Sequence, residues 1–593
     1  MSYVWLRIEP SVEYQHSAPA FLLSHSFFKS FPTWPGGLTD YGTAFLAQLS
    51  ANDLLGGLSF TLIGILVFLA TRKVLCQING AVPGFAPFVP PFVLLLLRER
   101  FYSPASAIDL GLLLSLGLAT GYGVLPSTRT WLRLAACWMG SALLFYVAGA
   151  WPCVLFVVLC ALFHVPRRRQ WVLGLGCALS LLVLPVGMLI SADTIKALNR
   201  WGNAMSGSVL AGVYLFFSIA AVVLALVPPA SEAKAEASPA RRKATRSVPA
   251  RSWFQTDGAK QAFAWSFLLL GWVVVWLAFD DQRKALAQVD CYSSRKEYDK
   301  VLAAAARIKT MNPPSEVRLH QALYHTGRLG EDLFSFTNQT VWDLMPALRQ
   351  GLNACRPQSE SLMELGQVNL AEHFAQDALE WEGERPDILR LLAQINIIEG
   401  RPRAAHSFLS VLRLVPFQEE WAGAYHDDLE ADPRLPHHQE LAPVLSLRVT
   451  TDLPHPVVPN ESILRQSLEA NRRNQMAFEY LMAHFLLTRR ADKIADEIGR
   501  LNDFEYVGIP RHYEEAILLQ ESRSGTRVNL RGRQIRPETL RRFEGFAVAM
   551  QNHVNDSPEG RQALARDFGD TFWYHFISGR RTPSDFKEDS RQQ

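Results

Sequence analysis

Three carboxylates stand near the start of the chain, in a segment with few other charges. Glu9 and Glu13 are four residues apart, so a helix there would place both side chains on one side. Asp40 follows in the same N-terminal segment. At the outer face of a membrane, a carboxylate can act as a general base or hold a divalent cation beside a lipid phosphate. Glu9, Glu13 and Asp40 are therefore the candidate catalytic residues; the alternative is that they cap or solvate interfacial helices.

The seven cysteines show no metal-binding pattern. Five of them (Cys76, Cys137, Cys153, Cys160 and Cys177) lie in or beside apolar segments, where a thiol usually packs as a small hydrophobic group. Without a CxxC pair or a Cys/His spacing typical of zinc, we expect neither a metal nor a cofactor. Cys291 and Cys355 lie in the polar half, where a disulfide between them requires an oxidising compartment. Nothing in the sequence brings the two together, so a disulfide and two free thiols both stay open.

Signatures of common enzymes are missing from the sequence. It has no Gly-rich phosphate loop, no HExxH and no GxSxG. Asp109 lies at the edge of an apolar segment, where ionisable groups tend to be functional. From that position its side chain can also reach lipid headgroups, and we favour that interpretation.

Charge and hydropathy divide the chain into two halves. Residues 1–279 hold 20 Lys and Arg against 10 Asp and Glu, whereas residues 280–593 hold the other 39 against 46. Between Leu54 and Val227 only Glu99, Asp109 and Asp193 are acidic, and a stretch so apolar cannot be the surface of a soluble protein. The acidic second half also argues against a nucleic-acid partner, because nucleic-acid binders carry a basic footprint.

Apolar stretches in the first half predict about eight membrane spans, since a bilayer core about 30 Å thick needs roughly 17–25 apolar helical residues. They are Leu54–Ala70, Pro83–Leu97, Ile108–Leu125, Leu132–Ala148, Trp151–Val165, Trp171–Ile190, Val209–Val227 and Ala262–Phe279. Four prolines crowd the first half of Pro83–Leu97, so that segment could be re-entrant instead.

Sidedness follows from the Lys and Arg residues near the span ends. With the basic linker 228–261 in the cytoplasm, 14 cations (Arg72, Lys73, Arg129, Arg133, Arg167 to Arg169 and seven in the linker) share that side, against six on the other. The sequence therefore predicts a multi-pass protein of a bacterial inner membrane, in contact with membrane lipid, whose C-terminal half lies outside the cytoplasm.

The second half shows the pattern of paired amphipathic helices. The segment Asp387–Pro416 fits the tetratricopeptide template, and the preceding segment repeats it, with 34 residues from Gly366 to Gly400. The predicted turn, close-contact and terminating positions are Gly366, Ala371, Ala375, Ala378, Ala393, Gly400, Ala405 and Pro416. Small residues recur in such repeats because the two helices of a pair must approach closely, and each pair buries its apolar face against its neighbours.

The predicted fold class is all-α, a transmembrane helix bundle followed by a soluble tetratricopeptide-like repeat domain. In chain order we expect an N-terminal extracytoplasmic segment (1–53), seven spans (54–227), a basic disordered linker (228–261), the last span (262–279), the repeat domain (280–524) and a helical cap (525–593). The aromatic run at 572–576 in the cap could bind a partner, but a helix that seals the repeats explains it better.

Three stretches carry a resemblance to a known family: RIEPSVEYQHS…FFKSFPTWPGGLTDYGTAFLAQL near the start, MAFEYLMAHFLLTRR, and IPRHYEEAILL after it. They resemble an uncharacterised family of bacterial membrane proteins, a domain of unknown function, over most of the chain. The resemblance implies an inner-membrane location with a helical-repeat tail, and no established activity.

Three classes of function remain open. The first is a non-enzymatic scaffold whose external repeat domain binds a protein or peptide partner, because superhelical repeats present extended concave surfaces. The second is a glycosyltransferase acting on lipid-linked sugars, suggested by the architecture alone. The third is a transporter, which needs buried charges and broken helices, for which only the proline-rich span gives a sign. We favour the scaffold.

Overall fold

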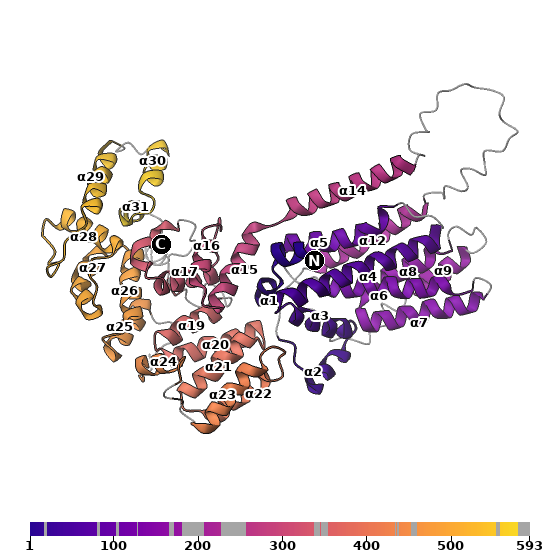
Figure 1. Ribbon diagram of the computed structural model, residues 1–593, viewed down its shortest axis with the longest axis horizontal. Helices are drawn as coiled ribbons and strands as arrows, with labels where there is room; N and C mark the ends of the chain where they lie inside the picture. The colour runs from indigo at the N-terminus through magenta and orange to yellow at the C-terminus, as the bar shows by residue number, and fades with distance from the viewer. Residues whose placement is uncertain are drawn as a thin grey trace, which may run out of the picture. The chain divides into compact units, whose positions relative to one another are not determined.

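The computed structural model describes residues 1–16, 20–79, 84–101, 106–126, 129–164, 171–180, 207–226, 257–336, 344–345, 354–432, 435, 438–451, 459–552 and 558–578. Within these ranges the secondary structure is helical, with no strand (Figure 1). The chain forms two compact units, Met1–Lys284 and Ala285–Gln593. The basic linker predicted at 228–261 lies mostly outside the described residues.

Short helices form the start of the first unit. They are η1 (Val4–Ile8), α1 (Pro10–His16), α2 (His25–Ser30), η2 (Phe31–Thr33) and α3 (Gly37–Leu49). Phe21, Phe31 and Tyr41 pack their rings together, with Tyr41 centroids 5.0 and 5.5 Å from the two phenylalanines. Aromatic edge contacts of this kind hold an otherwise polar segment against the helices that follow.

The rest of the first unit is a bundle of apolar helices. They are α4 (Asp53–Asn79), η3 (Ala86–Phe88), α5 (Val89–Phe101), α6 (Ser106–Val124), α7 (Thr130–Ala148), α8 (Ala150–Leu162), α9 (Trp171–Leu179), α12 (Gly207–Leu226) and α14 (Asp257–Ala278). The helix α6 packs against α4, α7 and α8, and its Leu112 is fully buried there together with Val67 and Phe156. A helix with no polar face can be stable only if both its neighbours and its surroundings are apolar.

Three helices in the described residues are long and apolar enough to cross a membrane: α4, α6 and α7. The predicted count of eight spans is not supported. The apolar stretches Ala150–Leu162 in α8 and Val209–Val223 in α12 are shorter within the described residues, and α14 joins the next helix, α15, through a bend of 57°. In the proline-rich stretch, η3 contains Pro87, and α5, with 13 residues, starts at Val89 and contains Pro90 and Pro91; Pro83 lies outside the described residues. Trp171–Ile190 runs beyond the described residues after α9.

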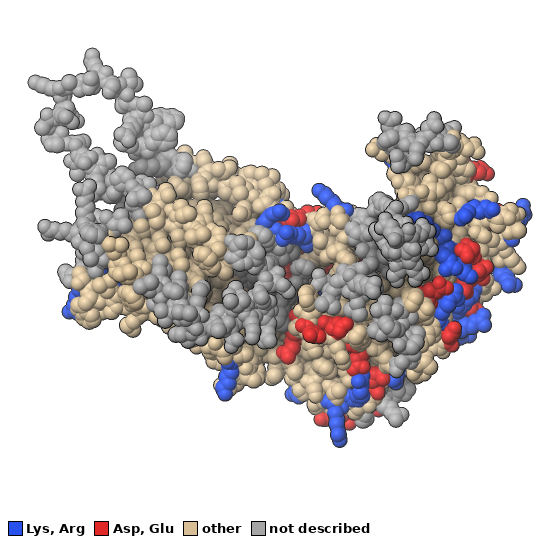
Figure 2. Space-filling view, turned by 180° about the vertical axis from the view of Figure 1, so that it is seen from behind, with Lys and Arg blue, Asp and Glu red and all other residues tan. Residues whose placement is uncertain are grey.

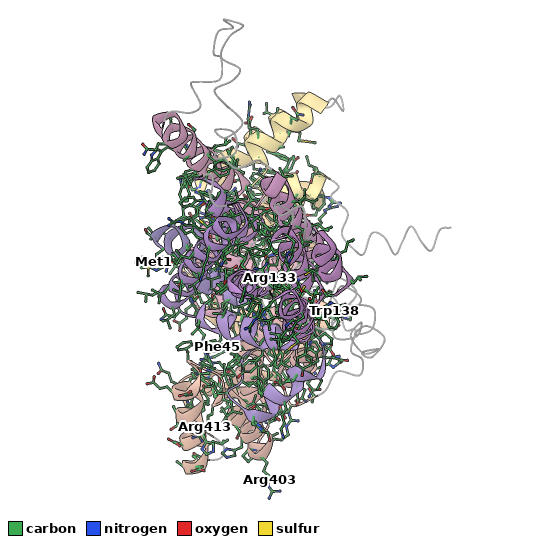
Figure 3. All side chains as sticks on the ribbon, turned by 90° about the vertical axis from the view of Figure 1, so that its right-hand side faces the viewer. Met1, Phe45, Arg133, Trp138, Arg403 and Arg413 are labelled. Carbon is green, nitrogen blue, oxygen red and sulfur yellow. The ribbon has the colours of Figure 1, made fainter. Side chains whose placement is uncertain are left out.

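Large apolar side chains cover the outside of this bundle. Exposed examples are Leu58, Leu62, Ile65 and Leu69 on α4, Met139 and Leu143 on α7, Phe216 and Ile219 on α12, and Leu269, Trp276 and Leu277 on α14. Phe45 and Trp138, labelled in Figure 3, are also exposed, whereas the Arg133 side chain is buried. On the face drawn in Figure 2, charged side chains gather over the second unit and are few over the first.

Helices of the second unit begin with α15 (Asp281–Ser294), which continues from the first unit. The others are α16 (Tyr298–Ala305), α17 (Pro313–His325), α18 (Leu329–Asp332), η8 (Leu333–Ser335), α19 (Cys355–Glu364), α20 (Val368–Glu382), α21 (Pro386–Ile398), α22 (Pro402–Leu412), α23 (Glu419–Ala431), α24 (Ala442–Leu447), α25 (Asn460–Ala470), α26 (Gln475–Leu487), α27 (Ala491–Glu497), η11 (Ile498–Phe504), α28 (Arg511–Ser524), α29 (Pro537–Asn552), α30 (Pro558–Phe568) and α31 (Phe572–Ile577).

Five helix pairs in this unit share one kind of turn. A residue with positive φ joins each pair: Lys296 (59°), Gly327 (68°), Gly366 (80°), Gly400 (70°) and Arg489 (60°). Glycine adopts this left-handed conformation without strain, and the lysine and arginine adopt it at a cost. The turn reverses the chain so that the second helix of each pair can pack on the first.

The predicted repeat positions lie where helix pairs require them. Gly366 and Gly400 form the turns of α19–α20 and α21–α22, and Pro416 lies in the turn after α22. The alanines Ala371, Ala375, Ala378, Ala393 and Ala405 are all 0–1% exposed. The two helix pairs therefore exist as predicted; their assignment to the tetratricopeptide class stays a prediction.

The Gly366 turn is also a junction between distant segments. The Val449 amide donates to the Gly366 carbonyl (2.9 Å), and the Asn474 side chain donates to the Leu365 carbonyl (3.0 Å). A Cβ atom on Gly366 would lie 2.1 Å from the Leu447 carbonyl oxygen, so only glycine fits. The helices of the second unit thus do not contact only their neighbours in sequence, as they would in a simple solenoid.

A terminal helix closes the second unit. Phe572 and Trp573 of α31 are fully buried, and the Trp573 indole donates to the Glu515 carbonyl of α28 (2.7 Å). The aromatic run of the sequence is therefore part of the core rather than an exposed patch.

Candidate functional site

Glu9 lies at the end of η1 in a left-handed conformation, with φ of 56°. Its carboxylate pairs with the Lys284 ammonium at 2.6 Å, and the same ammonium donates to the Arg7 carbonyl at 2.6 Å. This contact ties the N-terminal segment to the end of the first unit. Because η1 ends at Ile8 and α1 starts at Pro10, Glu9 and Glu13 do not lie on one helix, and the two carboxylates bind different partners.

Glu13 forms a buried ion pair with Arg98. Its side chain is 1% exposed, and both carboxylate oxygens accept from the Arg98 guanidinium of α5, at 3.0 Å for Nε to Oε1 and 2.7 Å for Nε to Oε2. Breaking a buried pair by removing one partner typically costs about 3–5 kcal/mol, because the other charge stays buried. In this arrangement Glu13 holds α1 to α5.

Asp40 lies in the first turn of α3 and is half-buried. Its carboxylate accepts a hydrogen bond from the Trp34 indole (3.2 Å). Burial raises the pKa of Asp40, and the Trp34 hydrogen bond opposes that rise. In the part of the chain that the structure describes, no group of His, Cys, Asp or Glu is arranged to hold a metal ion, so the three candidate carboxylates do not form a metal site.

Two further carboxylates of the first unit are buried more completely. Glu99 is 0% and Asp109 is 2% exposed. Oδ1 of Asp109 has no hydrogen-bond partner among the described residues, whereas the Glu99 carboxylate lies near the Tyr3 hydroxyl and the cations Arg7 and Lys284. The Asp109 side chain therefore points into the bundle, and the interpretation that it reaches the headgroups is wrong. Nearby Arg98 is already paired with Glu13.

Cys291 and Cys355 are both buried and are not joined by a disulfide in the structure. Cys291 lies in α15 and Cys355 begins α19. Burial raises the pKa of the Cys355 thiol to about 11, so very little of it is thiolate at neutral pH. The question of a disulfide in the cell stays a prediction for mass spectrometry of the unreduced protein.

A cavity of about 280 Å³ opens in the second unit. Its walls come from four places in the chain: the α17–α18 turn with α18, the middle of α26, the loop that leads into α28 with the first turn of α28, and the loop before α29. The lining residues are Gly327, Gly330, Glu331, Glu479, Tyr506, Gly508, Ile509, Pro510, Tyr513, Glu514, Gln534 and Arg536.

Glu479 supplies a buried carboxylate to this cavity. The residue is 5% exposed, and its Oε1 accepts from the Tyr506 hydroxyl and from the Gln475 amide (2.9 Å). Both hydrogen bonds end on the same oxygen, and among the described residues no cation lies within ion-pair distance of Glu479. Burial raises the pKa of Glu479, and the bonds from Tyr506 and Gln475 oppose that rise.

The other two carboxylates of the cavity are already bound by Arg536. The Arg536 amide and Nε each donate to Glu514, both at 3.0 Å. The Arg536 guanidinium also lies 3.3 Å from Glu331, whose Oε1 accepts from the first amide of α28, that of Arg511, at 3.1 Å. This group, which we call the Arg536 clamp, fixes the loop before α29 against the start of α28.

A strained loop forms one rim of the cavity. Glu505 has a φ of 58°, and two residues later Val507 is 99% exposed, whereas Ile509 is 4% exposed. Val507 lies between Tyr506 and Gly508, which both line the cavity. The loop therefore presents an apolar contact next to a buried negative charge.

Sequence reasoning missed this cavity, because its walls meet only in three dimensions. One signal pointed to it. The stretch MAFEYLMAHFLLTRR contains Glu479, and the stretch IPRHYEEAILL contains Ile509, Pro510, Tyr513 and Glu514. Two of the three stretches that carry the family resemblance thus line the same cavity.

Comparison with protein families agrees with that resemblance. A family model described as "Family of unknown function (DUF6057)" matches residues 1–579. The chain belongs to this family. No curated protein and no solved structure matches the chain. What a DUF6057 protein does must therefore be argued from its own residues.

Proposed function

We propose that this DUF6057 protein is a multi-pass protein of the bacterial inner membrane that presents its helical-repeat unit outside the cytoplasm to bind a protein or peptide partner. The observation that carries the proposal is the cavity of the second unit, with buried Glu479 inside it and exposed Val507 on its rim. Stacked helix pairs commonly present binding surfaces for extended segments, and the tetratricopeptide-like spacing from Gly366 to Gly400 belongs to that class.

Two observations support the membrane part of the proposal. The helices α4, α6 and α7 are long and apolar enough to span a bilayer, and their outward side chains, such as Leu62 and Leu143, are large and exposed. In water such a surface would drive association, whereas in lipid it is solvated. The sidedness rests on the bias of 14 cations against six in the sequence.

Reporter fusions test the topology. A reporter that is active only in the periplasm should be active when it is fused after Gln593 and silent when it is inserted near Ala237. The opposite pair of results would reverse the orientation, and with it the compartment in which the partner is found.

A photo-crosslinking amino acid tests the binding role. We expect this residue at position 507, in the full chain in cells, to form a covalent adduct with one discrete protein or peptide. The matched control is the same replacement at Val548, a 56% exposed valine of α29 away from the cavity lining. If position 507 gives no adduct beyond those of position 548, the repeat unit is not a binding module at this surface.

A second candidate function, transport, is favoured by one observation. Asp109 is buried in the bundle, and its Oδ1 has no hydrogen-bond partner among the described residues. Ionisable groups inside a membrane bundle are costly and commonly carry protons or ions. Loss of a proton-driven flux in proteoliposomes after Asp109→Asn, with the chain still folded, would favour transport over the scaffold.

The glycosyltransferase alternative draws less support from the geometry. Glu9 and Glu13 each pair with a cation, and Asp40 binds Trp34. Changing Glu9 and Glu13 separately to Gln, in a strain that lacks the native chain and shows an envelope-glycan defect, tests this alternative. Full rescue by both variants would remove it.

A further inference from the structure

The cavity in the second unit is small for a typical small-molecule site. Pockets for drug-sized ligands and cofactors measure about 300–1,000 Å³, and this one measures about 280 Å³. Its size suits one long side chain of a partner better than a whole cofactor. The exposed Val507 on the rim then has a role, because the partner's neighbouring residues can pack on it.

Charge decides which kind of side chain fits. Glu331, Glu479 and Glu514 line the cavity against a single cation, Arg536, which leaves a formal excess of two negative charges. The Arg536 clamp uses the arginine for Glu331 and Glu514. Glu479 is left without a cation among the described residues, and a buried carboxylate in that condition is strongly destabilised until a cation or a proton reaches it.

Hydrogen bonding points the same way. All hydrogen bonds to the Glu479 carboxylate within the described residues end on Oε1, from Tyr506 and Gln475. The second oxygen can therefore accept from an incoming N–H group. The rings of Tyr506 and Tyr513 also line the cavity, and aromatic faces attract ammonium and guanidinium groups.

An anionic ligand does not fit the same walls. The start of α28 could in principle attract an anion, because helix N-termini carry partial positive charge. That position is already occupied by carboxylates, since Glu331 accepts from the Arg511 amide and Glu514 lies in the first turn of α28.

We propose that the Glu479 cavity binds the ammonium or guanidinium group of a lysine or arginine side chain of the partner. The inference rests on the proposed function, because it names the chemistry of the partner at that same site. Glu479 receives the charge, Tyr506 and Tyr513 flank the side chain, and Val507 contacts the adjacent residues.

Labelled peptides and the full chain in lipid nanodiscs test the inference by fluorescence anisotropy. The probes are acetylated and amidated nonapeptides of Ala and Gln that differ only at the central residue, which is Lys, Arg, norleucine or Glu. We expect the Lys and Arg peptides to bind at least about tenfold more tightly than the norleucine peptide, because a buried ion pair is lost in the latter. Equal binding of Lys and norleucine peptides would overturn the inference.

Variants of the chain test whether the Lys preference comes from Glu479. Glu479→Gln keeps the shape and the hydrogen bonds to Tyr506 and Gln475, and it should reduce the preference for Lys to within about twofold. Glu469→Gln removes the same charge from an exposed position of α25 and should leave the preference intact. A Lys preference that survives Glu479→Gln would contradict the assignment.

A second variant covers the case in which Glu479→Gln fails to fold. Gln534 is exposed at the cavity, so Gln534→Lys should fold normally and place a resident cation there. We expect this variant to weaken binding of the Lys peptide at least about tenfold and to change binding of the norleucine peptide little. No change in either peptide would contradict the inference.

Two further measurements separate the possible failures. n-Butylamine carries the ammonium without a peptide; displacement of the Lys peptide by equal concentrations of it would make this a small-amine site and overturn the peptide assignment. If the native chain forms the crosslink at position 507 but binds the Lys, Arg and norleucine peptides equally, the inference fails and the proposed function stands. If no crosslink forms in the native chain, the proposed function itself fails.

Discussion

In the second unit three buried arginines lie among four carboxylates, whereas in the first unit Asp109 is buried and forms no ion pair among the described residues. The arginine network of the second unit consists of Arg318, Arg356 and Arg385 with Asp290, Glu360, Glu382 and Asp387. Its members come from α15, α17, α19, the end of α20 and the start of α21. The network therefore links five helices of the second unit.

Arg356 is the centre of this network. Its guanidinium lies 2.6 Å from Asp290, 3.0 Å from Asp387 and 3.3 Å from Glu382. Burial alone would raise the pKa of Asp290, but the charges of Arg356 and Arg318 outweigh it and hold that pKa well below its usual range. The buried charges here are mutually compensated and serve the fold.

Asp109 of the first unit has no such compensation. It is buried, and the nearby cation, Arg98, is bound by Glu13. A group that costs free energy and forms few contacts is kept for a reason other than stability. The comparison teaches that burial of charge by itself does not mark function. A buried carboxylate without an ion-pair partner is the stronger candidate, and Glu479 is an example in the second unit.

The largest expected effect comes from removing the centre of the arginine network. Arg356→Met should destabilise the second unit by about 3–5 kcal/mol, because Asp290 and Asp387 stay buried without their cation. Denaturant unfolding of the full chain in detergent measures the change. Arg401→Met is the matched control: its pair with Glu372 is 45% exposed on the arginine side, so the cost should be at most about 1 kcal/mol. Equal losses of unfolding free energy in the two variants would mean that the arginine network does not stabilise the second unit.

Acid should weaken the same network. The pKa values of Asp290 and Asp387 are lowered in the folded chain, in Asp387 because Arg385 and Arg356 outweigh burial. Stability from these groups is therefore present above the unfolded Asp pKa of about 3.9 and is lost as the pH falls through the lower folded values. We expect the unfolding free energy to drop by on the order of 2 kcal/mol between about pH 5 and pH 2. This decrease in unfolding free energy should be smaller in Asp290→Asn. An unchanged pH dependence of the unfolding free energy in that variant would assign the effect to other groups.

Packing can be separated from charge at Ala405. This residue is 0% exposed in α22, so Ala405→Phe should overpack the contact with α21 and cost about 1–3 kcal/mol. Ser407, exposed on the same helix, is the control, and Ser407→Phe should change the midpoint little. If Ala405→Phe keeps the melting temperature of the native chain, the helix register that places Ala405 at the contact with α21 is wrong.

The smallest effect is expected where a buried charge lacks a partner. Asp109→Asn should change stability by less than about 1 kcal/mol or even raise it, because it removes an uncompensated charge. Glu13→Gln is the contrasting variant and should cost about 3–5 kcal/mol, since Arg98 would stay buried alone. Unfolding of the two variants in the same detergent gives the comparison. A severe loss in Asp109→Asn would reveal a structural partner and remove the case for function at this site.

Local patterns in the sequence predicted the elements that local physics determines. The small residues Ala371 and Ala405 predicted close helix contacts, and Gly366 and Gly400 predicted the turns, because glycine is the residue that tolerates positive φ. The turns at Lys296 and Arg489 have the same conformation but carry side chains that do not predict it. The count of eight spans is not supported, because apolar composition does not show where a bend divides a helix and because Trp171–Ile190 runs beyond the described residues.

Features that depend on distant residues stayed out of reach. The pair of Glu13 and Arg98 joins residues 85 positions apart, and the Glu479 cavity joins four separate segments. No periodicity in the sequence indicates which distant residues come into contact. Asp109 illustrates the limit: its place in the sequence suggested a headgroup contact, and only the packing of the bundle shows that it points inward.

The contacts at the Gly366 turn divide the second unit into two parts that the order of its helices does not show. The chain leaves this turn into α20, runs through α21 to α24, and returns to the same turn at Leu447 and Val449. Both ends of that excursion are thus pinned at one point, as in a domain inserted into a host fold. The segment from α20 to α24 is therefore comparable to an inserted domain. No wall of the Glu479 cavity comes from it. Relatives in which this segment is longer, shorter or exchanged should keep the cavity unchanged.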